Sequence, residues 1–255
     1  MRGVRGQAMD PGQFRTTQNC IGPPGSSLEN ATYVPPPPSE LLNCLADWES
    51  FLHEDLRLPP LLRCALMHYQ FEAIHPFLDG NGRVGRLLLI LFLCSVGRLA
   101  APVLYLSPFF EAHRQEYYDL LRGITERSDW DAWLTFFLHG VTQQCRDAFL
   151  RVDRLSHLHD DYRQKLLGHR APPSALSLLE ELFLSPATTA KQAADRLHVT
   201  VVSASRAIQA LCDLGMLTEV TGRKRDRLYL AEGLIEAIDA DTGARDAITN
   251  QPTLF

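Results

Sequence analysis

A loop of twelve residues, His75–Arg86, sets the strongest limit on how this chain can fold. Its sequence is His-Pro-Phe-Leu-Asp-Gly-Asn-Gly-Arg-Val-Gly-Arg, and segments with the apolar spacing of helices flank it. The first segment begins after Pro60 and runs to about Ile74, and the second covers Arg83–Val96. Because a helix that is apolar on most faces is usually buried, we expect residues 83–96 at the centre of a mainly helical fold.

Two side chains of the loop suit proton transfer and metal binding. His75 follows a predicted helix, and a neutral imidazole can accept a proton near neutral pH. Asp79 offers the hard carboxylate oxygen that Mg²⁺ takes together with phosphate oxygens. Taken singly, a histidine before a proline is usually structural, and Asp-Gly-Asn-Gly is usually a turn. Their occurrence in one fixed order favours a functional site.

The other positions of the loop suit an anion. Gly80 and Gly82 allow unusual backbone angles, so successive N–H groups can converge on a ligand. The helix predicted to start near Asn81 adds its positive dipole end. Arg83 and Arg86 are three positions apart on one helix face, where planar guanidinium groups can grip phosphates. The loop therefore predicts a polyphosphate held beside a proton acceptor.

The same segment resembles the Fic motif, His-x-Phe-x-Asp/Glu-Gly-Asn-Gly-Arg-x-x-Arg, and matches it at every specified position. The resemblance extends over roughly residues 14–150, through Phe14-Arg15-Thr16, the four prolines 35–38 and the later segment around Trp130. It implies an adenylyltransferase that moves AMP from ATP onto a Ser, Thr or Tyr hydroxyl of a protein and releases pyrophosphate.

The resemblance also implies a role for each residue of the loop. His75 would take the proton of the target hydroxyl, and Asp79 would hold Mg²⁺ between the α- and β-phosphates. A hairpin flap, residues 17–34, would receive the backbone of the target protein as an added strand. The nucleotide-binding residues would be Gly80, Asn81 and Gly82, which line the anion hole, and Arg83 and Arg86, which grip the β/γ end.

Many relatives carry an inhibitory helix, Ser/Thr-x-x-x-Glu-Gly/Asn, whose glutamate pairs with the second arginine of the motif. In this chain Glu29 and Glu232 are followed by Asn or Gly, but the residues four positions before them are Gly25 and Leu228. Neither fits the pattern. We expect Arg86 to be unblocked in this chain, unless a longer natural chain or a separate partner supplies the glutamate.

The chain is expected to divide into an N-terminal arm with the flap hairpin (1–38), a Fic helical core (39–153), a linker (154–171) and a C-terminal domain (172–255). In the arm, Thr16–Ile21 and Asn30–Val34 could pair as short strands around a Gly-Pro turn. Ser39 suits the N-cap of the first core helix. Two later amphipathic stretches, 108–124 and 129–150, offer these core candidates: Trp130, Trp133, Phe136, Phe137 and Val141.

The C-terminal domain has the pattern of a winged helix-turn-helix. Helices are predicted over 175–184, 189–197 and 201–214, and strands over 216–220 and 227–230 bracket a basic turn. The fold class is thus mainly α, with a small β-hairpin flap and a C-terminal winged helix. The residues that could contact DNA within 201–227 are Ser203, Ser205, Arg206, Gln209, Arg223, Lys224, Arg225 and Arg227.

Charge leaves the partner of this domain open. Residues 172–255 hold eight Lys and Arg against eleven Asp and Glu, a net charge of −3, and DNA affinity depends on phosphate neutralisation. Protein docking and self-association as a homodimer are the alternatives. The whole chain, at a net charge of −5, has no general attraction to nucleic acid or acidic membranes. Six scattered cysteines without a C-x-x-C pair suggest reduced thiols, and hence a cytoplasmic location.

Two rival functions remain. A Fic enzyme could use another nucleotide, transfer a different phosphate-linked group or remove AMP, because the loop does not select the base. Alternatively, the chain could be a DNA-binding regulator whose Fic fold only senses a nucleotide.

Overall fold

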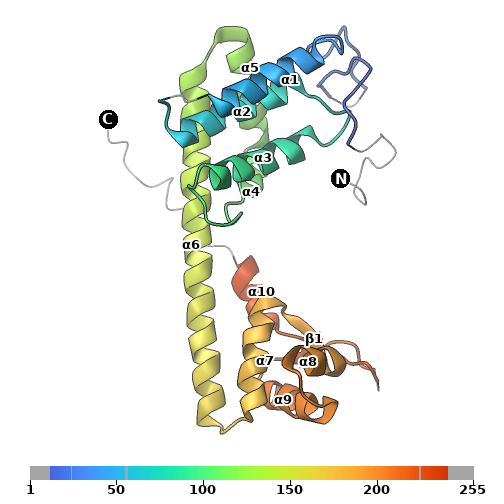
Figure 1. Cartoon of the computed structure of the whole chain (residues 1–255), viewed down its shortest axis with the longest axis vertical. Helices are drawn as coiled ribbons and strands as arrows, with labels where there is room; N and C mark the ends of the chain where they lie inside the picture. Colours follow the sequence, from blue (N-terminus) through green and yellow to red (C-terminus); the bar gives the residue numbers. More distant parts are fainter. Residues whose placement is uncertain (1–11, 24, 55–56, 224, 241–255) are drawn as a thin grey trace. The chain divides into compact units, whose positions relative to one another are not determined.

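The computed structural model describes residues 12–23, 25–54, 57–223 and 225–240 in two compact units, Met1–Cys145 and Arg146–Phe255 (Figure 1). The division falls inside helix α6, Trp130–Gly168. The expected linker, 154–171, is therefore helical as far as Gly168. Tyr162 and Leu166 explain the difference, because both are buried in the hydrophobic core of the second unit.

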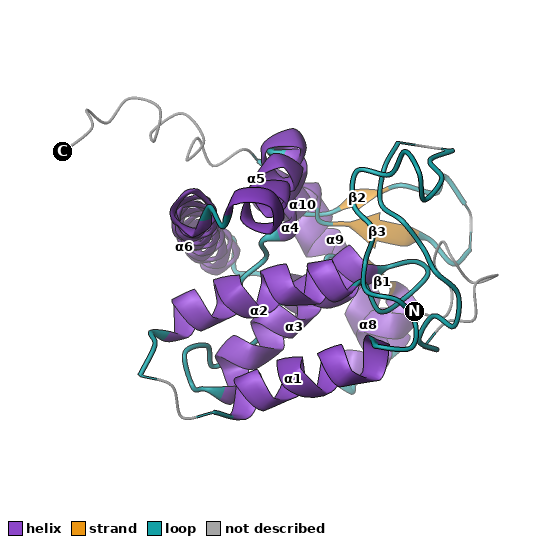
Figure 2. Ribbon diagram, turned by 90° about the horizontal axis from the view of Figure 1, so that it is seen from above, coloured by secondary structure: helices purple, strands orange, loops and turns teal. Residues whose placement is uncertain are grey.

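The first unit is a bundle of helices around one hydrophobic core. Helix α2 packs against both α1 and α3 (Figure 2). Two buried indoles fix its position, since Trp48 and Trp133 donate hydrogen bonds of 2.9 and 3.0 Å to backbone carbonyl groups of α2. The helices of this unit are α1 (Leu41–His53), α2 (Pro60–Ile74), α3 (Asn81–Ser95), α4 (Ser107–Ala112), α5 (Arg114–Arg127) and the first part of α6.

Helix α3 is less buried than its apolar sequence predicted. Leu89 and Leu93 lie in the core, but the side chains of Leu87 and Leu91 are 53% and 50% exposed. Only one face of the helix contacts the bundle. Of the core candidates in α6, Trp133, Phe136, Phe137 and Val141 are buried, and Trp130 packs against the same core while partly exposed.

The first core helix begins at Leu41, and the prediction that Ser39 caps it is wrong. The N-cap residue is Glu40, which makes no capping hydrogen bond with its side chain. Instead, the carbonyl groups of Pro37 and Pro38 accept hydrogen bonds from the N–H groups of Glu40 and Leu41. The proline run thus supplies the acceptors that a serine hydroxyl would otherwise have provided.

The second unit packs helices α7 (Pro173–Leu184), α8 (Ala190–Leu197), α9 (Val201–Asp213) and α10 (Glu232–Asp239) beside a small sheet. The three strands, β1 (Ala187–Thr189), β2 (Thr218–Glu219) and β3 (Leu228–Leu230), are antiparallel in the order β1-β3-β2. The pair β2–β3 lies within the two predicted strands, while β1 was not anticipated.

Capping explains the two helices in the middle of this unit. The Thr189 hydroxyl accepts a hydrogen bond from the backbone N–H of Gln192, and the Gln192 side-chain oxygen accepts one from the backbone N–H of Thr189. Thr200 caps α9 in the same way through the N–H of Ser203. On α9, Ser205, Arg206 and Gln209 are exposed. The assignment to the winged helix-turn-helix class stays a prediction, and Lys224 lies outside the described residues.

Across the described ranges, no helix has the length and apolar character required to cross a membrane.

Candidate active site

His75 ends helix α2 in a left-handed backbone conformation. Its φ is 50°, and its N–H donates a 3.0 Å hydrogen bond to the carbonyl oxygen of Phe71. Pro76 explains the ending, because a proline disfavours the helical conformation in the residue before it. The chain turns away at this point, and the imidazole is left beside the loop that follows.

Asn81 holds that loop closed. Its side chain is 2% exposed, accepts a 2.8 Å hydrogen bond from the N–H of Phe77 and donates another of 2.8 Å to the carbonyl of Phe77. Sequence reasoning placed Asn81 in the anion hole. In this structure its side chain fixes the loop, and Phe77 packs against the core.

Arg15 ties the N-terminal segment to the same loop. The side chain is only 3% exposed, and Nε donates a 3.0 Å hydrogen bond to the carbonyl oxygen of His75. The other donor, Nη2, bonds the carbonyls of Pro36 and Ile74. Burial is the main cause that lowers the pKa of Arg15. The sequence resemblance included Arg15, but nothing in the sequence predicted that it holds the end of α2.

The flap is held by much less pairing than predicted. In place of two strands, residues 16–21 and 30–34 form a single antiparallel bridge between Ile21 and Tyr33, with hydrogen bonds of 2.9 and 3.0 Å. The Tyr33 hydroxyl also donates to the carbonyl of Ala73 in α2. Prolines on both sides remove the donors that longer strands would need.

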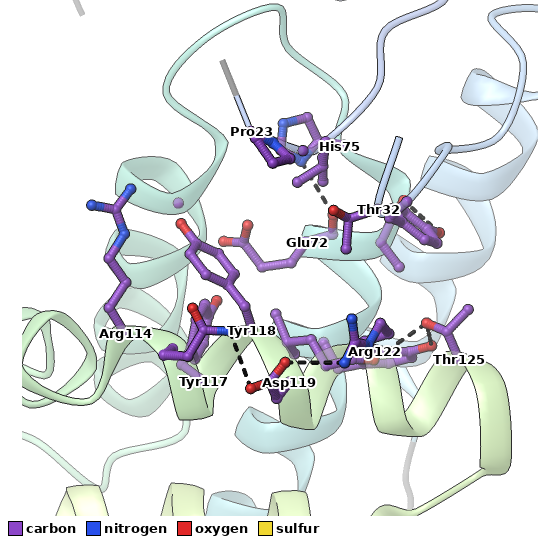
Figure 3. Close-up of a pocket in the computed structure, with 18 of the residues that line it drawn as sticks. Pro23, Thr32, Glu72, His75, Arg114, Tyr117, Tyr118, Asp119, Arg122 and Thr125 are labelled. Atoms are coloured by element: carbon purple, nitrogen blue, oxygen red, sulfur yellow. Dashed lines mark hydrogen bonds and ion pairs between the residues drawn. The ribbon is translucent and has the colours of Figure 1, made fainter. Parts of the chain in front are cut away.

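A pocket of about 540 Å³ opens between the flap, α2, α3 and α5. Volumes of this size are usual for small-molecule sites. Three of the predicted site residues, His75, Gly82 and Arg86, line it, and α5 contributes Tyr117, Tyr118 and Arg122 among others (Figure 3).

The other four predicted residues, Asp79, Gly80, Asn81 and Arg83, do not line this pocket. Asp79 and Arg83 are partly exposed and form an ion pair of 3.0 Å. Gly80 precedes α3 with a φ of 89°, a conformation that glycine adopts without strain.

Arg86 projects from α3 into the pocket, where its Nε donates a 3.0 Å hydrogen bond to the hydroxyl of Ser107. Among the described residues, no glutamate forms an ion pair with Arg86. Glu72 of α2 is nevertheless close enough for the charge of Arg86 to lower the pKa of Glu72, against a larger upward effect of burial.

The imidazole of His75 is suited to accept a proton. Burial lowers its pKa from 6.5, and the nearby charge of Arg15 acts in the same direction, against a hydrogen bond with the Glu72 backbone. Nδ1 lies 3.3 Å from the Glu72 carbonyl, which can only accept a hydrogen bond. The neutral ring therefore carries its hydrogen on Nδ1 and its lone pair on Nε2.

Comparisons with known proteins show what this chain is similar to. Residues 2–93 match the family model described as the Fic/DOC family. The chain is 30% identical over 152 residues to "Protein adenylyltransferase Fic" of Culex quinquefasciatus, which covers 58% of this chain and 27% of that protein. It is 36% identical over 175 residues to the protein of the same name from Nematostella vectensis, covering 66% and 36%.

One solved structure shares the fold. A Fic family protein from Desulfovibrio desulfuricans G20 superposes with a TM-score of 0.50 at 20% identity, over 89% of this chain and 64% of that one. Residues 2–93 therefore match the Fic/DOC family, and the solved structure shows a similar fold. It spans about a quarter to a third of the length of the two curated relatives.

Proposed function

We propose that this protein transfers AMP from ATP to a Ser, Thr or Tyr hydroxyl of a target protein. The observation that carries the proposal is the placement of His75 and Arg86 in one pocket, with a neutral proton acceptor beside a phosphate-binding group. The names of the relatives support the same reaction class.

In this reaction the target oxygen attacks the α-phosphorus and forms a new P–O bond. The bond between the α-phosphorus and the oxygen that bridges to the β-phosphate breaks, and pyrophosphate leaves. Nε2 of His75 accepts the hydroxyl proton. Arg86 and the first turn of α3 hold the phosphate chain, because catalysis of phosphoryl-type transfer depends mainly on positioning and charge neutralisation.

Asp79 would hold Mg²⁺ in this proposal. It is an accessible carboxylate just before the first turn of α3, and the residues that the structure describes contain no group of three or more His, Cys, Asp or Glu suited to a metal. Such a donor set fits an ion shared with phosphate oxygens better than an all-protein cage. When bound, the ion would offset negative charge on the phosphates. The Asp79 carboxylate would then bind the ion in place of its ion pair with Arg83.

The flap would bind the target protein. Among the described residues of the flap, the bridge between Ile21 and Tyr33 is the one strand-like pairing, which leaves an edge suited to the addition of an extended segment.

A labelling experiment tests the proposal. The protein is incubated with Mg²⁺, a candidate target mixture and ATP labelled either at the α- or at the γ-phosphate. We expect label on protein only from α-labelled ATP, and none with His75→Ala. The matched control is His53→Ala, which removes an exposed histidine at the end of α1.

Each other outcome has a distinct meaning. Transfer from γ-labelled ATP would make the protein a kinase-type enzyme and contradict AMP transfer. Tight ATP binding without transfer, together with sequence-specific DNA retention, would favour the nucleotide-sensing regulator. Mass spectrometry of labelled protein would identify the modified side chain.

A further inference from the structure

Glu72 presents a buried carboxylate oxygen in the pocket that the proposed reaction does not use. The residue lies one helical turn before His75, and its side chain extends between α2 and α5 (Figure 3). Among the described residues, its Oε1 atom is buried and has no hydrogen-bond partner. Burying a carboxylate oxygen without a hydrogen-bond partner costs folding free energy, so its presence in a ligand pocket suggests a function.

The carboxylate of Glu72 and the guanidinium of Arg86 both lie close to Gly82 in the first turn of α3. A Cβ atom built on Gly82 would lie 3.8 Å from Oε1 of Glu72 and 3.0 Å from Nη1 of Arg86. A Cβ atom on Gly85 would lie 2.6 Å from the same Oε1. The carboxylate therefore occupies space that only a glycine leaves open, beside the guanidinium that is expected to grip phosphate.

The positive charge of Arg86 lowers the pKa of Glu72, against the larger upward effect of burial. On α2, His68 is neutral because burial lowers its pKa to about 3, and the pKa of His75 is lowered as well. On α5, burial raises the pKa of Tyr117 well above its usual value, so its phenol is also uncharged. With both effects together, the pKa of Glu72 is about 7, because burial raises it by more than Arg86 lowers it. The charged residues Arg114, Asp119 and Arg122 of α5 line the same pocket.

We propose that Glu72 is a positioning residue for Arg86 that takes up a proton from solvent when the phosphate chain of the nucleotide enters the pocket. In the free protein the carboxylate balances part of the charge of Arg86. An entering polyphosphate takes over that charge, and its own negative charge disfavours an ionised carboxylate nearby. This inference rests on the proposed nucleotide site and adds a coupling between binding and protonation.

Calorimetry measures the coupling directly. Mg²⁺-ATP is titrated into the intact chain at about pH 7 in two buffers with different heats of ionisation, which yields the number of protons exchanged. Because a carboxyl group with a pKa of about 7 is half ionised at that pH, we expect uptake of about 0.5 proton per bound ATP. Affinity should be constant below about pH 6 and fall up to tenfold per unit as pH rises above about 7.

Three variants assign the proton. Glu72→Gln should bind Mg²⁺-ATP without proton uptake and with little dependence on pH. His75→Asn should keep the uptake, and Asp119→Asn, which removes a carboxylate on the same pocket, should keep it too. A residue with only a structural role would not change the proton count.

The wild-type titration decides the proposal even if Glu72→Gln fails to fold. Binding of Mg²⁺-ATP with no proton uptake would overturn the inference and leave the proposed function intact. Uptake that persists in Glu72→Gln would overturn it as well. No binding of Mg²⁺-ATP at all would overturn both the inference and the proposed function.

Discussion

Arg15 donates a 3.0 Å hydrogen bond from Nε to the carbonyl oxygen of His75, a residue 60 positions later in the chain. Its backbone N–H also donates to the carbonyl of Pro76. The N-terminal segment therefore fixes the backbone on both sides of the proposed base. A mobile imidazole would weaken catalysis, because proton transfer requires a well-aligned acceptor.

Substitution Arg15→Ala should destabilise the protein and slow transfer. The change leaves the buried carbonyl group of Ile74 and the partly buried ones of Pro36 and His75 without this donor, and the loss of one buried bond costs about 1–3 kcal/mol. Urea denaturation measures the free energy of unfolding. Arg98→Ala, at an exposed arginine, is the control. Equal stability of the two variants would contradict the role assigned to Arg15.

Asn81→Ala should loosen the loop without emptying the pocket. It removes both hydrogen bonds to Phe77 and leaves two partly buried backbone groups unpaired, at a cost of about 1–3 kcal/mol each in unfolding free energy. The exposed Asn43→Ala is the matched change. If Asn81 instead acts only through the anion, stability should be unchanged while the KM for ATP rises.

Gly85→Ala should be strongly destabilising, although alanine usually favours a helix. The new methyl group would meet Glu72 Oε1 at 2.6 Å and ring atoms of Phe71 and His68 at 3.2 and 3.3 Å. Gly168→Ala, with no atom within 4 Å, should instead stabilise the chain by about 0.5–1 kcal/mol. Thermal unfolding compares them. A double change, Gly85→Ala with Glu72→Ala, should recover part of the loss, since it removes the closest contact.

The pH profile of transfer should reflect the neutral His75. Its pKa in the folded protein lies below 6.5, so the imidazole stays able to accept a proton at pH values where a free histidine is mostly charged. We expect the acidic limb of kcat/KM to have its midpoint below pH 6.5. A midpoint at or above that value would argue against His75 as the base.

The same shift has a consequence for stability. Because the folded state lowers the pKa of His75, its contribution to stability is complete above 6.5 and is lost as pH falls toward the folded-state value. His75→Asn removes the imidazole, so the free energy of unfolding should depend less on pH over that range.

The sequence predicted helix α2 and the start of α3 closely, since Pro60, Pro76 and the two glycines mark their ends with simple backbone rules. It also assigned His75 and Arg86 to one site, and both line the same pocket. These predictions were local, or followed from a motif with fixed spacing.

The contacts that the sequence did not reveal join distant segments. Arg15 looks like an ordinary arm residue, and Glu72 looks like one polar position on a helix. Their roles depend on which carbonyl groups and glycines fold against them. Residues 154–168 were misjudged for a similar reason, because a polar helix and a polar linker have the same composition until Tyr162 and Leu166 find a core.

The contact between Glu72 and Gly85 limits how the family domain can vary. A side chain at position 85 has room only if the residue at position 72 is shorter or its carboxylate turns away. Glycine at position 85 is therefore what allows the carboxylate of Glu72, thirteen residues earlier, to keep its present place beside α3.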